Sequence, residues 1–92
     1  MFYKIYQTNN RRYVFMGHEY AKKNGFSLND YNMVYEGEIE REKTINETLE
    51  KIYVQLNMYR PDDYNARSLS VSDIVEINGE KYYVDSLGFT RI

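Results

Sequence analysis

Residues 57–92 decide the fold, and they read NMYRPDDYNARSLSVSDIVEINGEKYYVDSLGFTRI. Within this stretch, Asn78-Gly79 is the two-residue signature of a type I′ hairpin turn. It predicts an antiparallel hairpin of Val71–Ile77 with Glu80–Asp85, followed by a turn and a short edge strand at Phe89–Ile92. The register places two favourable pairs across this hairpin, Glu76 with Lys81 and Val75 with Tyr82.

The polar loop, residues 58–73, comes before this hairpin. Pro61 presets the backbone for a turn, and the aspartates after it can accept hydrogen bonds from nearby amides. One interpretation is an ordered connection in which Asp63, Arg67 and Asp73 pair with one another or with the backbone. The other is a recognition loop on a rigid scaffold. The recognition interpretation assigns protein contacts to Arg60, Asp63, Tyr64 and Arg67.

A long helix is predicted over Thr44–Asn57. Thr44 and Glu47 have the spacing of a capping box, in which each side chain satisfies a free backbone amide of the first turn. Glu47 and Lys51 are expected to pair one turn apart on the solvent side. The apolar positions recur at helical spacing and predict one stripe that packs on a sheet: Ile45, Leu49, Ile52, Tyr53 and Leu56.

The N-terminal half predicts more strands and a short helix. Phe2–Gln7 and Arg12–Met16 are rich in aromatic and β-branched residues, and the polar residues between them predict a first hairpin. A short helix is expected at His18–Asn24, and a connecting loop at Ser27–Asp30. Tyr31–Glu40 alternates as a half-buried strand. Its inward face is predicted to hold Tyr31, Met33, Tyr35 and Ile39.

This order of elements predicts the α+β class. Strands joined by short turns form a mostly antiparallel sheet of five or six strands, with the long helix packed on it and one short helix. The chain has 92 residues, which fits a single domain over 1–92. It has no cysteine, so disulfides and thiolate metal sites are excluded. No apolar run approaches the roughly 20 residues of a membrane span, and the N-terminus does not resemble a signal peptide, so we expect a cytoplasmic location without a membrane partner.

Charge is unevenly distributed along the chain. Residues 1–23 contain five basic residues and one acid, whereas residues 24–50 contain seven acids and two bases. The N-terminal hairpin could bind nucleic acid through the charges of Arg11 and Arg12. Its tyrosines could stack on bases: Tyr3, Tyr6 and Tyr13. The glutamates of residues 36–50 suggest the converse, a mimic of nucleic acid. The net charge of −2 favours neither.

Catalytic, metal and cofactor motifs are weak. His18 is the sole histidine, and a triad with Ser70, Ser72, Asp73 or Asp85 can be assembled only on paper, since the chain has no G-x-S-x-G elbow. The acidic strand face could attract divalent cations only weakly. Because the glycines are scattered, no phosphate-binding loop is predicted. We therefore expect no enzyme activity, no metal and no cofactor.

The strings RPDDYNARSLSVSDIV (60–75) and KYYVDSLGF (81–89) resemble the YodL-like domain family. The resemblance extends upstream to YKIYQ (3–7), YVFMG (13–17), MVYEGEI (33–39) and IYVQLN (52–57). Ala66-Arg67 departs from the glycine-histidine that we associate with the family. The resemblance implies a small cytosolic domain of Firmicutes-type bacteria, often carried by phages and conjugative elements, with no catalytic residues to transfer.

The leading functional hypothesis is therefore a non-catalytic protein-interaction module of a phage or mobile genetic element. Its partner would be a protein of the host, such as a defence or maintenance factor, or of the element. The alternative is a nucleic-acid-binding accessory protein that uses Arg11, Arg12 and Tyr13. An exposed edge strand makes either a monomer or a weak homodimer the expected state.

Overall fold

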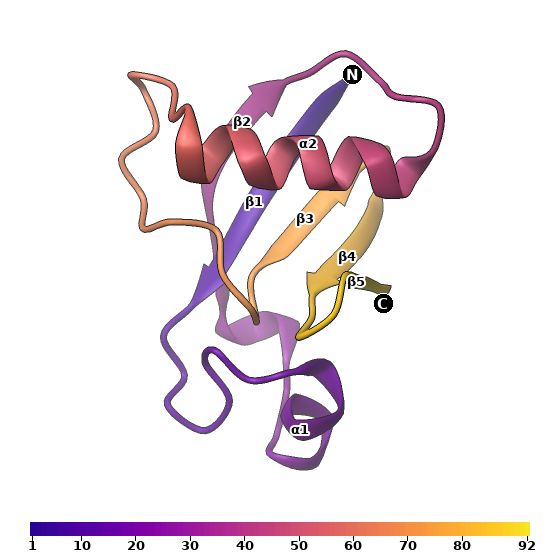
Figure 1. Ribbon diagram of the computed structural model, residues 1–92. Coiled ribbons are helices and arrows are strands. Elements are labelled where there is room, and N and C mark those ends of the chain that lie inside the picture. The colour runs from indigo at the N-terminus through magenta and orange to yellow at the C-terminus, as the bar shows by residue number, and fades with distance from the viewer.

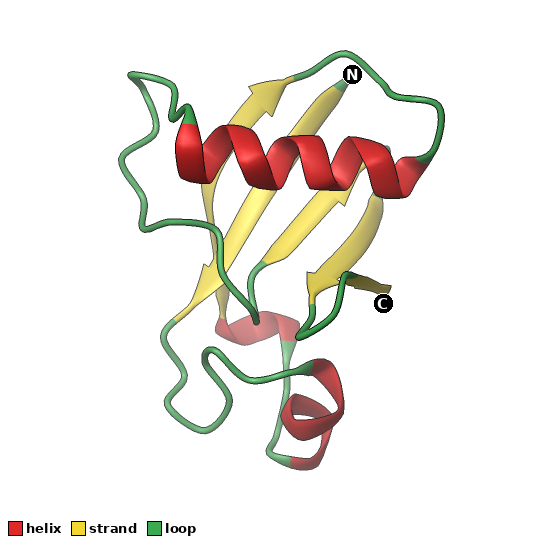
Figure 2. Ribbon diagram, viewed as in Figure 1, coloured by secondary structure: helices red, strands yellow, loops and turns green.

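The computed structural model describes residues 1–92 and has one antiparallel sheet of five strands in the order β2-β1-β3-β4-β5 (Figure 1). The α+β class is confirmed. Figure 2 shows α2 lying across one face of the sheet and α1 at one end of the sheet. The strands are β1 (Phe2–Thr8), β2 (Tyr31–Glu38), β3 (Ile74–Ile77), β4 (Glu80–Val84) and β5 (Phe89–Arg91). The helices are α1 (His18–Lys23), the 3-10 turn η1 (Leu28–Asp30) and α2 (Ile45–Met58).

The C-terminal hairpin has the predicted register. Glu76 pairs with Lys81 and Val75 with Tyr82 across β3 and β4. Asn78 and Gly79 have φ values of 53° and 80°, the left-handed conformations that a type I′ turn requires. β5 pairs with β4 at the edge of the sheet, as expected.

The long helix α2 begins where the capping box predicts. The Thr44 hydroxyl accepts a hydrogen bond from the Glu47 amide at 3.1 Å, and it donates one to the Glu47 carboxylate at 3.0 Å. The predicted pair of Glu47 with Lys51 is wrong, because Lys51 reaches across to Glu42 at 2.9 Å. The apolar stripe of α2 packs on the sheet in the main core, whose central members are the fully buried Ile5, Leu49, Ile52, Leu56 and Val75. The prediction of Tyr53 as a stripe member is wrong, because this residue is 37% exposed and lies outside this core.

The opposite face of the sheet carries a second, smaller core. Tyr13, Ala21, Ile74 and Tyr83 are buried there, and Phe26 and Tyr31 pack against them. The chain between β1 and β2, including α1, thus covers one end of this face (Figure 1). Neither helix is long and apolar enough to cross a lipid bilayer.

The predicted N-terminal hairpin is wrong. Residues 9–17 form turns, and the two neighbours of β1 are β2 and β3. Asn10 organises the turn locally, since its side chain accepts from the Arg12 amide and its carbonyl accepts from the amides of Tyr13 and Val14. Such local bonds compete with strand pairing, and they direct Tyr13 into the second core.

The predicted single inward face of residues 31–40 is also wrong. The pairing of β1 with β2 shifts between Ile5, opposite Tyr35, and Tyr6, opposite Met33, so Val34 is an extra residue in a β-bulge. Because side chains alternate along a strand, one extra residue exchanges the two faces. Tyr35 therefore packs with the main core and Tyr31 with the second core. A smaller difference is that the expected loop at Ser27–Asp30 contains the 3-10 turn η1.

Candidate functional site

Hydrogen bonds close the polar loop at its base. The Asn57 side chain donates to the Leu69 carbonyl at 3.0 Å and accepts from the Leu69 amide at 2.8 Å. The side-chain carboxamide of Asn57 acts as a substitute for a backbone partner, since it presents a donor and an acceptor side by side. The bonds fix the end of α2 to the return segment of the loop, and Leu69 is buried in the main core.

The far end of the loop is held by a buried network around Asp73. The Asp73 side chain is fully buried and pairs with the Arg67 guanidinium at 2.9 Å. Asp73 also accepts from the Gln7 amide at 3.1 Å and from the Ser70 backbone amide at 2.8 Å. Burial raises the pKa of the Asp73 carboxyl, and the bonds from Arg67, Ser70 and Gln7 oppose that rise. The Arg67 guanidinium is itself held by the Thr8 carbonyl at 2.8 Å and lies over the Phe15 ring.

The four predicted contact residues of the loop separate into two pairs. Tyr64 is 3% exposed, belongs to the main core and donates its hydroxyl hydrogen to the Arg67 carbonyl. Arg67 serves the Asp73 network, as the ordered-loop interpretation expected. Arg60 and Asp63 are exposed. Arg60 lies over the Tyr64 ring and donates to the Ser68 hydroxyl at 2.7 Å, and Asp63 accepts from the Tyr35 hydroxyl at 3.1 Å.

The three residues of the nucleic-acid hypothesis are likewise divided. Arg11 and Arg12 are exposed on the turn after β1. Tyr13 is 1% exposed and donates its hydroxyl hydrogen to Asp30 at 2.8 Å, so its ring cannot stack on a base without leaving the second core. The buried Tyr3 lies in the main core, on the other face of the sheet.

His18 lies at the start of α1, close to Asp85. Its backbone amide donates to the Asp85 carboxylate at 3.2 Å, while its ring packs against Phe26 and Tyr83. Asp85 therefore serves as a partner for one free amide of the first helical turn, that of His18. Nowhere in the chain are three or more histidine, aspartate or glutamate side chains placed to hold one metal ion.

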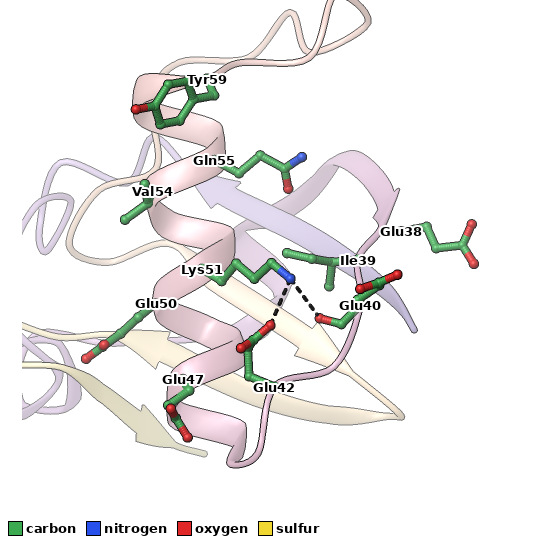
Figure 3. A pocket seen from close by; sticks show the side chains of 10 residues that line it. All are labelled: Glu38, Ile39, Glu40, Glu42, Glu47, Glu50, Lys51, Val54, Gln55 and Tyr59. Atoms are coloured by element: carbon green, nitrogen blue, oxygen red, sulfur yellow. Dashed lines mark hydrogen bonds and ion pairs between the residues drawn. The ribbon is translucent and has the colours of Figure 1, made fainter.

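An acidic groove, lined by Glu38, Ile39, Glu40 and Glu42 and by residues of α2, is the largest hollow of the surface, at about 810 Å³ (Figure 3). Lys51 and Gln55 point from α2 toward the segment around Ile39, and the Lys51 ammonium contacts Glu42 and the Glu40 carbonyl. Sequence reasoning noted the glutamates here but missed the apolar members of the lining. These are Ile39, Val54 and Tyr59. Tyr59 is the last of them and directly precedes Arg60 of the polar loop.

Comparison with known proteins identifies the family of the chain. The model of the YodL-like domain matches residues 1–92. The chain belongs to the YodL-like domain family. Neither a curated protein nor a solved structure matches it.

In this YodL-like domain, the string 60–75 contributes to both the loop and its anchor. Three of its buried members, Tyr64, Leu69 and Asp73, connect the loop to the sheet and the helix. Two of its exposed members, Arg60 and Asp63, are fixed in position by Ser68 and Tyr35. The arrangement can present one positive and one negative group at defined positions, and Arg60 directly follows Tyr59 of the acidic groove.

Proposed function

We propose that this YodL-like domain is a non-catalytic protein-interaction module that binds its partner through the polar loop. One observation carries the proposal: an exposed polar loop is held at both ends by partly buried hydrogen bonds, at Asn57 and at Asp73. A loop that is already ordered loses little conformational entropy on binding, so more of its contact energy appears as affinity. Polar loops on rigid scaffolds are frequent sites of recognition.

Arg60 and Asp63 are the two loop residues that we assign to partner contact. Arginine and aspartate together favour a partner that presents both charges, which is typical of a protein surface and not of a nucleic-acid backbone. Tyr64 and Arg67 act in this proposal as positioning residues, because both are engaged within the domain. The partner is a protein of the bacterial host or of the mobile element that carries the domain, and binding takes place in the cytoplasm.

The test is an affinity pull-down from host lysate, read by mass spectrometry, with the variant Arg60→Ala/Asp63→Ala. The matched control is Lys23→Ala/Glu19→Ala, which removes one positive and one negative group from the exposed surface of α1. We expect the wild type and the control to retain one stoichiometric protein and the loop variant to lose it. Full retention by the loop variant would show that Arg60 and Asp63 are not contacts.

A nuclease arm of the same pull-down tests the nucleic-acid alternative. That function would depend on Arg11 and Arg12, because Tyr13 is buried. Recovery that vanishes with nuclease, together with weakened oligonucleotide binding by Arg11→Ala/Arg12→Ala at low salt, would replace the protein-binding proposal.

A further inference from the structure

We propose that the acidic groove is a docking site for a basic, amphipathic segment of the partner protein, in which lysines or arginines alternate with apolar residues. The inference rests on the proposed function, because it names the chemistry of the same partner. The groove ends at Tyr59, next to Arg60, so one partner can contact the polar loop and the groove together.

The charges of the groove are the first argument. Glu38, Glu40, Glu47 and Glu50 line it, and none of them is in an ion pair. Lys51 is the sole base of the lining, and it is already held by Glu42 at 2.9 Å. Three other glutamates, Glu19, Glu76 and Glu80, each have a lysine or arginine partner. Unpaired negative charge concentrated in a hollow attracts a positively charged ligand and orients its approach.

Exposed apolar side chains are the second argument. Of the groove lining, Val54 is 44% exposed on the helix face turned away from the main core, and Tyr59 is 72% exposed. The outward face of a surface helix is normally polar. Tyrosine is enriched where proteins meet. A ligand bound by charge alone would leave these side chains in water, whereas an amphipathic segment covers them.

Gln55 supplies the third argument. Its side-chain oxygen is buried and has no hydrogen-bond partner. Buried polar atoms are nearly always satisfied, so an exception calls for a missing partner. The Gln55 amide points toward the chain around Ile39, at the side of the groove (Figure 3). Because this oxygen is buried, the Gln55 amide has to rotate toward the groove before a lysine ammonium, an arginine N–H or a backbone N–H of a docked segment can satisfy it.

The shape of the groove favours a peptide over a metal ion. Its glutamates are spread along an open groove with a volume of about 810 Å³. They do not converge, since no group of three acidic or histidine side chains is placed to hold one ion. A peptide with spaced positive charges matches such a distribution, because each charge can approach a different carboxylate.

The test measures the binding of a short fluorescein-labelled peptide, in which lysine or arginine alternates with leucine, by fluorescence anisotropy. Glu38→Gln/Glu40→Gln removes two charges of the groove, and Val54→Ser removes an apolar contact. The matched control is Glu19→Gln/Glu36→Gln, two exposed glutamates outside the groove. We expect Kd to rise about tenfold in the charge variant, about threefold in Val54→Ser, and by less than twofold in the control. When the peptide is added, changes in backbone amide chemical shift in NMR spectra should be confined to residues 38–59.

Three results would overturn the inference. The first is an equal loss of affinity in the groove variant and the control, and the second is a set of NMR shifts outside the groove. The third is concentration-dependent dimerisation that Glu38→Gln/Glu40→Gln abolishes, because a second copy of the chain would then occupy the site. The pull-down separates this inference from the proposed function. If Glu38→Gln/Glu40→Gln retains the partner and Arg60→Ala/Asp63→Ala loses it, the groove proposal alone is contradicted. If both variants retain the partner, both proposals are contradicted.

Discussion

At the scale of single residues, Asp73 and Arg67 matter most for the polar loop. Removing one partner of a buried ion pair leaves the other charge without compensation, which costs about 3–5 kcal/mol in fully buried sites. The Arg67 side chain is 28% exposed, so water relieves part of this cost. We expect Arg67→Ala to lower the free energy of unfolding by about 2–4 kcal/mol, as measured by urea denaturation.

A double-mutant cycle identifies the cause of this loss. Asp73→Asn removes the buried negative charge, so Arg67→Ala/Asp73→Asn should cost clearly less than the sum of the single variants. Arg67→Lys is the conservative control and should fall between the wild type and Arg67→Ala, because an ammonium lacks the fork that bonds Asp73 and Thr8 together. Additive effects of the two single variants would contradict a direct pairing.

At the scale of elements, Asp85 connects α1 to the turn between β4 and β5. It accepts hydrogen bonds from the His18 amide, the Ser86 amide and the Thr90 hydroxyl. Burial tends to raise its pKa, but these bonds outweigh burial and leave the pKa below 3.8. A carboxylate with a lowered folded pKa stabilises the fold above its unfolded pKa, and that stabilisation is lost as pH falls through the folded pKa.

The consequence is a pH-dependent effect of Asp85→Asn. We expect this variant to lower the free energy of unfolding by about 1–2 kcal/mol at pH 7. The difference from the wild type should shrink as pH falls below 3.8. Urea denaturation at neutral and acid pH measures it, with Asp62→Asn, an exposed aspartate of the polar loop, as the control. A difference that stays constant with pH would show that the charge of Asp85 is not the source.

At the scale of the whole molecule, tyrosines fill both cores. Tyr3 is buried between the sheet and α2, and Tyr83 is buried on the opposite face. Burial, the largest influence, raises the pKa of Tyr3 from 10.0 to about 12 and raises that of Tyr83 further. A raised folded pKa means that stability is fully present below pH 10.0 and is lost as pH rises through the folded value. The fold should therefore weaken steeply in alkali.

Tyr3→Phe tests this alkaline weakening directly. The variant keeps the buried ring and removes the titrating hydroxyl, so it should match the wild type closely at pH 8. At pH 11 it should be more stable than the wild type by about 1 kcal/mol, because the wild-type tyrosine ionises more readily when unfolded. Urea denaturation at both pH values measures the difference. Equal stability at pH 11 would show that Tyr3 ionises in the folded state as freely as in the unfolded chain.

The amino-acid sequence by itself determined the elements whose signals are local. The Asn78-Gly79 hairpin, the Thr44–Glu47 cap, the stripe of α2 apart from Tyr53, and the α+β class all follow from neighbouring residues and are present. The ordered-loop interpretation is confirmed for Arg67 and Asp73, which pair with each other, whereas Asp63 bonds the Tyr35 side chain instead of a loop partner. The assignment of Arg60 and Asp63 to a partner stays a prediction.

Only the tertiary structure decided what depends on contacts between distant segments. The choice of β2 and β3 as neighbours of β1 excluded the N-terminal hairpin, and the bulge at Val34 exchanged the faces of β2. The burial of Tyr13 and Tyr64 was equally invisible in the sequence, because an aromatic residue has the same local pattern in a core and on a surface. The acidic groove exists because α2 packs beside the chain that leaves β2, and a long-range packing geometry of this kind is set by the whole sheet rather than by any single segment.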